Sequence, residues 1–176
     1  MKRTLGLTLL LFATLFSCMR QEKPLPAELS RAESVMWEHP DSALSILRSM
    51  PQSSLSSGKN YATWALLLAQ ARDKVYGKRL PDSLNIPSSD KLVQDAMDYF
   101  EKEGNLKRMA QTYYYKGQLL KDQKKITEAM PFFLKSKEMM TKLDEPLFTY
   151  LICQSLGNTY RYQDLYEESL VQLKDA

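Results

Sequence analysis

The sequence predicts an all-α fold, in which about four helical hairpins stack on one another into a right-handed superhelix. The main observation is an internal repeat, because the pattern of residues 110–137 returns forty residues later in residues 150–176. A second observation is that apolar residues recur every three or four positions within each segment, as on one face of a helix. A third is that Pro and Gly residues stand between these segments, where helices are expected to end.

Three matched pairs of residues define the repeat. They are Gly117 with Gly157, Ala129 with Ser169, and Phe133 with Leu173. In both copies the small residue follows the Gly by twelve positions, and the large apolar residue follows four positions later. Small residues let two helices approach closely, so we expect these six residues to pack the helices of each hairpin together.

The first copy reads Tyr113-x-x-Lys116-Gly117-x-x-Leu120 and then Ala129-x-x-x-Phe133. This spacing resembles the tetratricopeptide repeat, whose pattern is W-x2-L-G-x2-Y, then A-x3-F and a closing P. The second copy keeps the Leu, Gly and Tyr of that pattern, and the copies depart from it where Tyr113 and Cys153 replace the Trp. The resemblance implies a helical solenoid that serves as a binding scaffold for many kinds of client.

A narrower resemblance rests on three stretches of the chain. They are Pro40-Asp41-Ser42-Ala43-Leu44, Leu67-x-x-x-Ala71-Arg72-Asp73-Lys74 and residues 95–104. They resemble tetratricopeptide lipoproteins and membrane regulators that are common in Bacteroidetes. In longer members of that group, further repeats lead to a transmembrane helix and a cytoplasmic DNA-binding domain. The resemblance therefore implies either a lipoprotein or the sensory part of a transcriptional regulator.

The N-terminal residues predict export. Lys2 and Arg3 precede an apolar run over residues 5–16, which is shorter than the roughly 20 residues that span a bilayer, so residues 1–17 are expected to form a signal peptide. The ending Leu15-Phe16-Ser17-Cys18 resembles the bacterial lipobox. That resemblance implies cleavage after Ser17, lipid on Cys18, and anchoring at the cell envelope. It does not indicate which membrane leaflet carries the lipid. The alternatives are an ordinary signal peptide with an incidental Cys and an uncleaved anchor.

A short tether and four helical pairs are expected to follow. The tether covers residues 18–27, and the pairs cover roughly residues 28–50, 60–103, 106–140 and 147–176. In the first pair, Pro40 is expected to separate the two helices, and Asp41 is the expected N-cap of the second helix. In the second pair, residues 77–89 form a long connection that contains two Pro residues.

The residue types exclude most enzyme classes. The chain has one His and two Cys, which are too few for a metal cluster or for most pairs of nucleophile and base. It also has no Gly-rich phosphate loop, so we expect no catalytic residue, no metal and no cofactor. Without residues 1–17, the chain keeps 22 basic against 21 acidic residues, which gives no electrostatic footprint for nucleic acid.

A candidate binding groove follows from the repeat register. The residues after each aligned Gly position are Gln70, Gln118 and Asn158. Three amides at one offset form a ladder that could bind the backbone of an extended peptide, because an amide both donates and accepts. The groove would be extended one turn earlier by Tyr114 and Gln154. Three residues later lie Lys121 and Arg161, whose charges could hold an acidic group of the ligand. The alternative is that these are ordinary polar residues on exposed helices.

The leading functional prediction is non-enzymatic binding of a protein or peptide at the cell envelope, by a lipoprotein adaptor or assembly scaffold. A second hypothesis is the sensory portion of a transmembrane transcriptional regulator. A third is capture of a glycan or a peptide for an uptake system. The sequence does not distinguish the oligomeric states.

Overall fold

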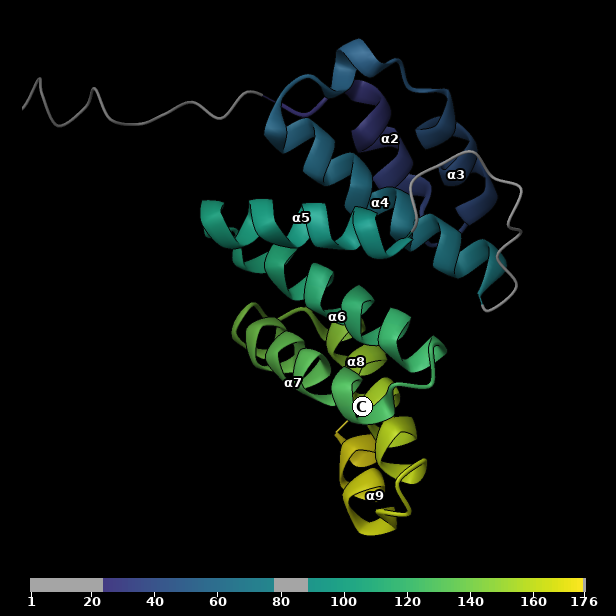
Figure 1. Ribbon diagram of the computed structural model, residues 1–176, viewed down its shortest axis with the longest axis vertical. Coiled ribbons are helices and arrows are strands. Elements are labelled where there is room, and N and C mark those ends of the chain that lie inside the picture. The colour runs from purple at the N-terminus through teal and green to yellow at the C-terminus, as the bar shows by residue number, and fades with distance from the viewer. Residues whose placement is uncertain (1–23, 78–88, 176) are drawn as a thin grey trace, which may run out of the picture.

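The computed structural model describes residues 24–77 and 89–175, and in these residues the chain is helical, without a strand (Figure 1). The elements are α2 (Ala27–Val35), α3 (Pro40–Ser49), the short 3-10 helix η2 (Gln52–Leu55), α4 (Gly58–Tyr76), α5 (Ser89–Glu103), α6 (Leu106–Asp122), α7 (Ile126–Lys142), α8 (Pro146–Arg161) and α9 (Tyr166–Lys174). The prediction of an all-α fold is confirmed. The expected signal peptide, Cys18 and most of the expected tether lie outside the described residues.

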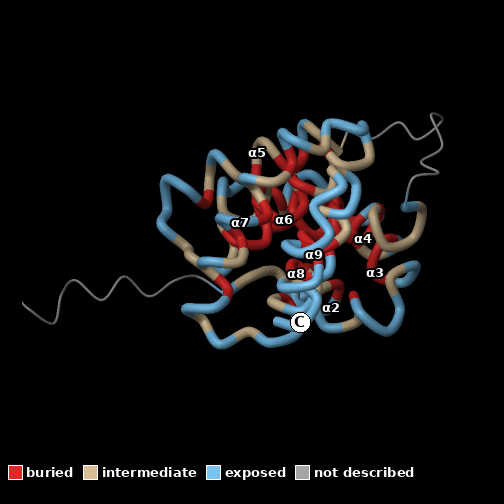
Figure 2. The backbone as a smooth tube through the Cα atoms, turned by 90° about the horizontal axis from the view of Figure 1, so that it is seen from below, coloured by how far each residue is buried: buried red, intermediate tan, exposed pale blue. Residues whose placement is uncertain are grey.

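The helices pack in the order of the sequence. Each helix from α2 to α8 contacts the next helix along the chain, and α2 with α4, α4 with α6, and α6 with α8 are also in contact. The even-numbered helices therefore form one continuous layer, and the stack is elongated from α2 at one end to α9 at the other (Figure 1). Figure 2 shows the buried segments along the inside of this stack and a mostly exposed α9.

Helix α4 is enclosed by its neighbours over more than half of its length. Every residue from Ala62 to Arg72 is buried, because α2, α3, α5 and α6 all contact this helix. Trp64 donates a hydrogen bond from Nε1 to the Leu47 carbonyl oxygen at 2.8 Å, so the polar atom of this buried indole is satisfied by α3. The other buried residues of this stretch are apolar, except for Thr63, Gln70 and Arg72.

The third and fourth hairpins close at their glycines. Gly117 on α6 faces the ring of Phe133 on α7, and Gly157 on α8 faces the side chain of Leu173 on α9. The small residues lie at the same crossings. Ala129 is fully buried, and Ser169 donates a hydrogen bond from Oγ to the Gly157 carbonyl oxygen at 2.8 Å.

Helices α6, α7 and α8 end in the same way, at intervals of twenty residues. Lys124, Asp144 and Asp164 have φ values of 64°, 53° and 60°, in the left-handed region. In each turn the next residue donates its backbone N–H to a carbonyl near the helix end, as in the bond from Lys125 to Leu120 at 2.9 Å. This arrangement satisfies carbonyl groups that the helix leaves without a partner.

One expected cap differs from the structure. Helix α3 begins at Pro40, its N-cap is His39, and Asp41 lies in its first turn. Pro is well suited to the first helical position, because the N–H that it lacks would have no partner inside the helix. The prediction that Asp41 caps this helix is therefore wrong.

Candidate ligand-binding face

The three amides of the predicted ladder lie on α4, α6 and α8, but they differ in exposure. Gln70 is only 4% exposed, whereas Gln118 and Asn158 are half-buried. A peptide on this face can reach α6 and α8 more easily than α4. The accessible part of the ladder therefore consists of Gln118 and Asn158.

Tyr114, one turn before Gln118, packs within the protein. It is 5% exposed, and its ring centroid lies 5.9 Å from that of Phe133 and 5.6 Å from that of Phe148. Burial raises the pKa of Tyr114 to about 12. Its hydroxyl oxygen accepts a hydrogen bond from Gln118 Nε2 at 2.8 Å, so Tyr114 orients the Gln118 amide from below rather than contacting a ligand.

Gln118 is engaged at both ends of its amide. Nε2 donates to Tyr114, and Oε1 accepts a hydrogen bond from Lys121 Nζ. Carboxylates also lie near this lysine. Burial, followed by the nearby charge of Asp122, raises the pKa of Asp73, and Lys121 acts in the opposite direction. The positive charge predicted at Lys121 is therefore balanced by acidic groups, which leaves less attraction for an acidic ligand.

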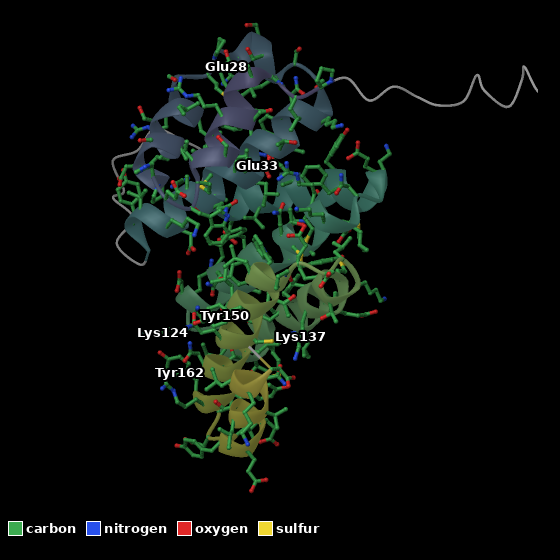
Figure 3. The ribbon with its side chains drawn as sticks, turned by 180° about the vertical axis from the view of Figure 1, so that it is seen from behind. Glu28, Glu33, Lys124, Lys137, Tyr150 and Tyr162 are labelled. Atoms are coloured by element: carbon green, nitrogen blue, oxygen red, sulfur yellow. The ribbon has the colours of Figure 1, made fainter. Side chains whose placement is uncertain are left out.

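Helix α8 presents the more open part of the face. Tyr150, Gln154 and Arg161 are exposed, and Asn158 between them is half-buried. Spacings of four, four and three residues place these four side chains on one stripe of the helix. Gln154 Nε2 lies 3.4 Å from the Tyr150 hydroxyl, and Arg161 forms no ion pair with any described residue. Figure 3 shows Tyr150 and Tyr162 along this side of the molecule.

An aromatic contact next to α4 joins the first hairpin to the fourth. The ring of Trp37, just after α2, meets Phe148 of α8 edge to face, with 5.9 Å between centroids. Lys74 of α4 covers the Trp37 ring, with Nζ 3.4 Å from its centroid. A lysine at this distance contributes a cation–π attraction of about 1 kcal/mol. The sequence predictions did not include this cluster.

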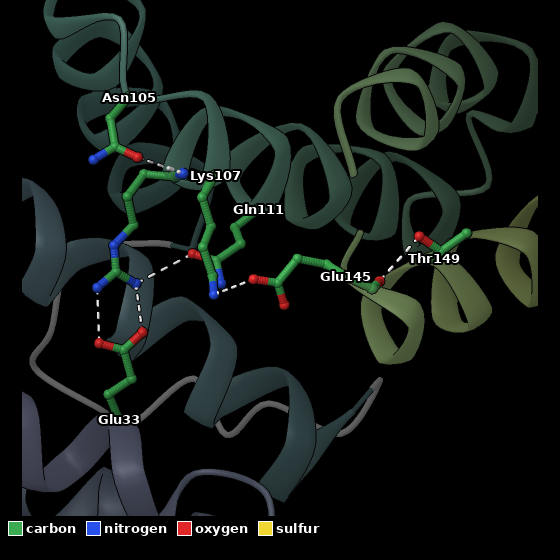
Figure 4. Close-up of polar contacts among 7 residues, drawn as sticks. Glu33, Asn105, Lys107, Gln111, Glu145 and Thr149 are labelled. Carbon is green, nitrogen blue, oxygen red and sulfur yellow. Dashed lines mark hydrogen bonds and ion pairs between the residues drawn. The ribbon is translucent and has the colours of Figure 1, made fainter. Parts of the chain in front are cut away.

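Ion pairs join the N-terminal end of α6 to α2 and to the start of α8 (Figure 4). Arg108 of α6 donates to both carboxylate oxygens of Glu33 on α2, at 2.8 and 2.7 Å, and to Gln111 Oε1 at 3.1 Å. Lys107 of α6 pairs with Glu145, which precedes α8. A bidentate pair of Arg and carboxylate fixes orientation as well as distance, so this contact ties Glu33 of α2 to Arg108 in the first turn of α6.

The described part of the chain holds neither a disulfide nor a cluster of metal-binding residues. Cys153 is fully buried and has no disulfide partner there, and no three His, Cys, Asp or Glu residues gather in a way that could hold a metal ion. Among the described helices, none combines the length and the apolar character that a membrane span requires.

Comparisons of the chain with protein-family profiles, with curated proteins and with solved structures found no match in any of the three.

Proposed function

We propose that this chain is a tetratricopeptide-like repeat scaffold that binds an extended segment of a protein partner along α8 and the C-terminal half of α6. The observation that carries this proposal is the open stripe of Tyr150, Gln154, Asn158 and Arg161 on α8. The amides of this stripe can both donate to and accept from the backbone of a peptide. The contacts between successive even-numbered helices support the repeat assignment, because they give one continuous face.

The stripe also favours one kind of peptide. Arg161 is exposed and has no ion-pair partner among the described residues, so its charge is available for a carboxylate of the ligand. Tyr150, at 43% exposed, offers a ring on which an apolar side chain can pack. The preferred ligand is therefore an extended segment with an apolar residue and an acidic residue about five positions apart. Eleven residues of helix from Tyr150 to Arg161 span roughly 16 Å, and an extended chain rises about 3.3 Å per residue.

The binding experiment begins with selection of peptides from a displayed library on the purified full chain. The affinities of selected peptides are then measured for Arg161→Glu and for Gln154→Ala with Asn158→Ala. Loss of a charged hydrogen bond predicts at least a tenfold weaker affinity for Arg161→Glu. Lys142→Glu on α7 is the matched control, because Lys142 is also an exposed cation.

Two results would contradict this assignment. Selected peptides that bind the Arg161 variant and the double variant as tightly as the wild type would place the ligand elsewhere. Saturable binding of a small glycan, without peptide binding, would favour the capture hypothesis instead.

Attachment to the envelope through Cys18 is part of the same proposal and rests on the lipobox-like ending at residues 15–18. Intact mass of the native protein, extracted from its own cells with detergent, tests it. The mature chain is expected to begin at Cys18 and to carry acyl chains there, and Cys18→Ser should lose the acyl mass. A mass without acyl chains would indicate an ordinary signal peptide. A much larger polypeptide mass would favour the sensory portion of a transmembrane regulator.

A further inference from the structure

Exposed apolar side chains gather at one end of the stack, on and around α9. Six of the ten large apolar residues that are exposed in the described chain lie there: Tyr162, Leu165, Tyr166, Leu170, Val171 and Leu173. Leu170 and Val171 are both 54% exposed. A concentration of this kind on a soluble surface marks an interaction site more often than isolated apolar residues do.

The packing of α9 fixes which side faces outward. Ser169 donates a hydrogen bond to the Gly157 carbonyl oxygen of α8. Gln172 Oε1 accepts a hydrogen bond from Lys137 Nζ of α7 at 2.8 Å. The side of α9 opposite these two residues carries Glu167, Leu170, Val171 and Lys174. Their spacing of three, one and three positions forms a single stripe along the helix. We call these four residues the α9 stripe.

The α9 stripe is complementary to itself. When two copies of α9 lie antiparallel about a twofold axis between Leu170 and Val171, each Leu170 faces Val171 of the other copy. The same operation brings Glu167 opposite Lys174, and symmetry forms each contact twice. Neither Glu167 nor Lys174 has an ion-pair partner within the described residues. We propose that the α9 stripe is the contact surface of a twofold-symmetric homodimer.

The opposite end of the stack disfavours a head-to-tail assembly. The exposed residues of α2 include Glu28, Ser30 and Arg31, and they offer no apolar counterpart to Leu170 and Val171. A closed pair of identical surfaces therefore fits better than an open chain of copies. Because α9 is short, the contact belongs to interfaces below about 1,200 Å², and we expect a dissociation constant of about 1 µM or weaker.

The test is sedimentation velocity on the full chain over a range of concentrations that spans the expected dissociation constant. The wild type should shift from monomer to dimer, and Leu170→Asp should remain monomeric. Glu167→Lys and Lys174→Glu each place like charges opposite one another at two positions, so each should weaken the dimer about tenfold. The double variant Glu167→Lys with Lys174→Glu restores opposite charges and should recover most of the wild-type affinity.

Recovery in the double variant is specific to a homodimer, because there both copies carry the reversed charges. A partner of different sequence would keep its own charges, and binding to it would not recover. Arg31→Glu, an equal charge reversal on α2, is the matched control and should leave the dimer unchanged. Thermal melting of each variant checks that α9 remains folded.

Two results would overturn the proposal. The first is a wild-type chain that is monomeric at all concentrations. The second is a dimer that both single reversals leave intact, or that the double variant fails to restore.

Discussion

Gly117 lies so close to Phe133 that a Cβ atom built on this glycine would stand 2.7 Å from Phe133 Cε1. The equivalent pair in the next hairpin is Gly157 and Leu173, with a corresponding distance of 2.8 Å to Leu173 Cγ. The partners differ in freedom, because Phe133 is fully buried and Leu173 is 49% exposed. The two hairpins therefore pack at equivalent glycines, but a larger residue at Gly157 is expected to be tolerated better than one at Gly117.

The first prediction follows from this difference. Gly117→Ala should lower the free energy of unfolding by about 1–3 kcal/mol, because the buried Phe133 ring has no space into which to move. Gly117→Leu should cost more. Gly157→Ala should cost less or be neutral, because Leu173 can rotate toward solvent and Ala is favoured over Gly in helices by about 1 kcal/mol. Urea denaturation measures both variants. Equal losses would contradict the difference in tolerance.

The second prediction concerns the ion pair between Glu33 and Arg108. A double-mutant cycle with Glu33→Gln and Arg108→Ala should give a coupling free energy of about 1 kcal/mol, because the pair is bidentate and Arg108 is largely buried. The pair of Glu138 and Lys142 on α7 is the control. Both of its side chains are more than 60% exposed, so its coupling should be about 0.3–0.5 kcal/mol. A coupling no larger than the control would mean that the pair does not hold α2 to α6.

The third prediction is a loss of stability at high pH. Burial raises the pKa of Tyr114 from 10.0 to about 12, so the folded chain keeps a proton that the unfolded chain has released. The contribution of Tyr114 to the free energy of unfolding is complete below pH 10 and is lost as the pH rises toward 12. A difference of this size corresponds to roughly 2–3 kcal/mol.

Tyr114→Phe should therefore flatten the fall of stability between pH 10 and pH 12. Guanidinium denaturation at several pH values measures this slope. Some fall will remain, because burial also raises the pKa of Tyr113 to about 12. Tyr150→Phe, which removes a phenol hydroxyl at an exposed position on α8, is the control. If the wild type and Tyr114→Phe lost stability equally between pH 10 and pH 12, the raised pKa of Tyr114 could not be the cause of the loss.

The fourth prediction concerns the left-handed turn at Lys124. A lysine at φ 64° carries a steric cost, which is about 1–2 kcal/mol for a residue with a Cβ atom. Lys124→Gly should therefore raise the free energy of unfolding, by about 0.5–1 kcal/mol after the greater entropy of Gly in the unfolded chain is included. Asp144→Gly should gain less, because Asp tolerates this conformation better. A thermal melt compares the two, and equal gains would argue against the steric cause.

The helical class could be predicted from sequence because it depends on local patterns. Gly117 and Gly157 recur with a small and a large residue at fixed offsets, and those offsets are set by the geometry of two packed helices. The left-handed turns at Lys124, Asp144 and Asp164 were not predicted. Lys and Asp are much weaker sequence signals for a left-handed helix end than Gly is.

Exposure on the candidate face could not be predicted in the same way. Tyr114 and Gln154 occupy the same offset in their hairpins, but Phe148 of the following hairpin covers Tyr114, whereas Gln154 is exposed. The forty-residue spacing aligns Phe148 with Arg108, so the repeat pattern does not predict an aromatic side chain at this position. Exposure depends on this neighbour from another hairpin rather than on the offset itself.

The contact between Trp37 and Phe148 also affects how the protein opens. In a stack with contacts between neighbours alone, the terminal units can fray without disturbing the middle. Here the end of α2 packs on α8, and Glu33 of α2 is bonded to α6, so detachment of the first hairpin uncovers side chains of the third and fourth. Amide hydrogens of α2 and α8 should consequently exchange with solvent in one cooperative opening, which makes the two halves of the chain a single folding unit.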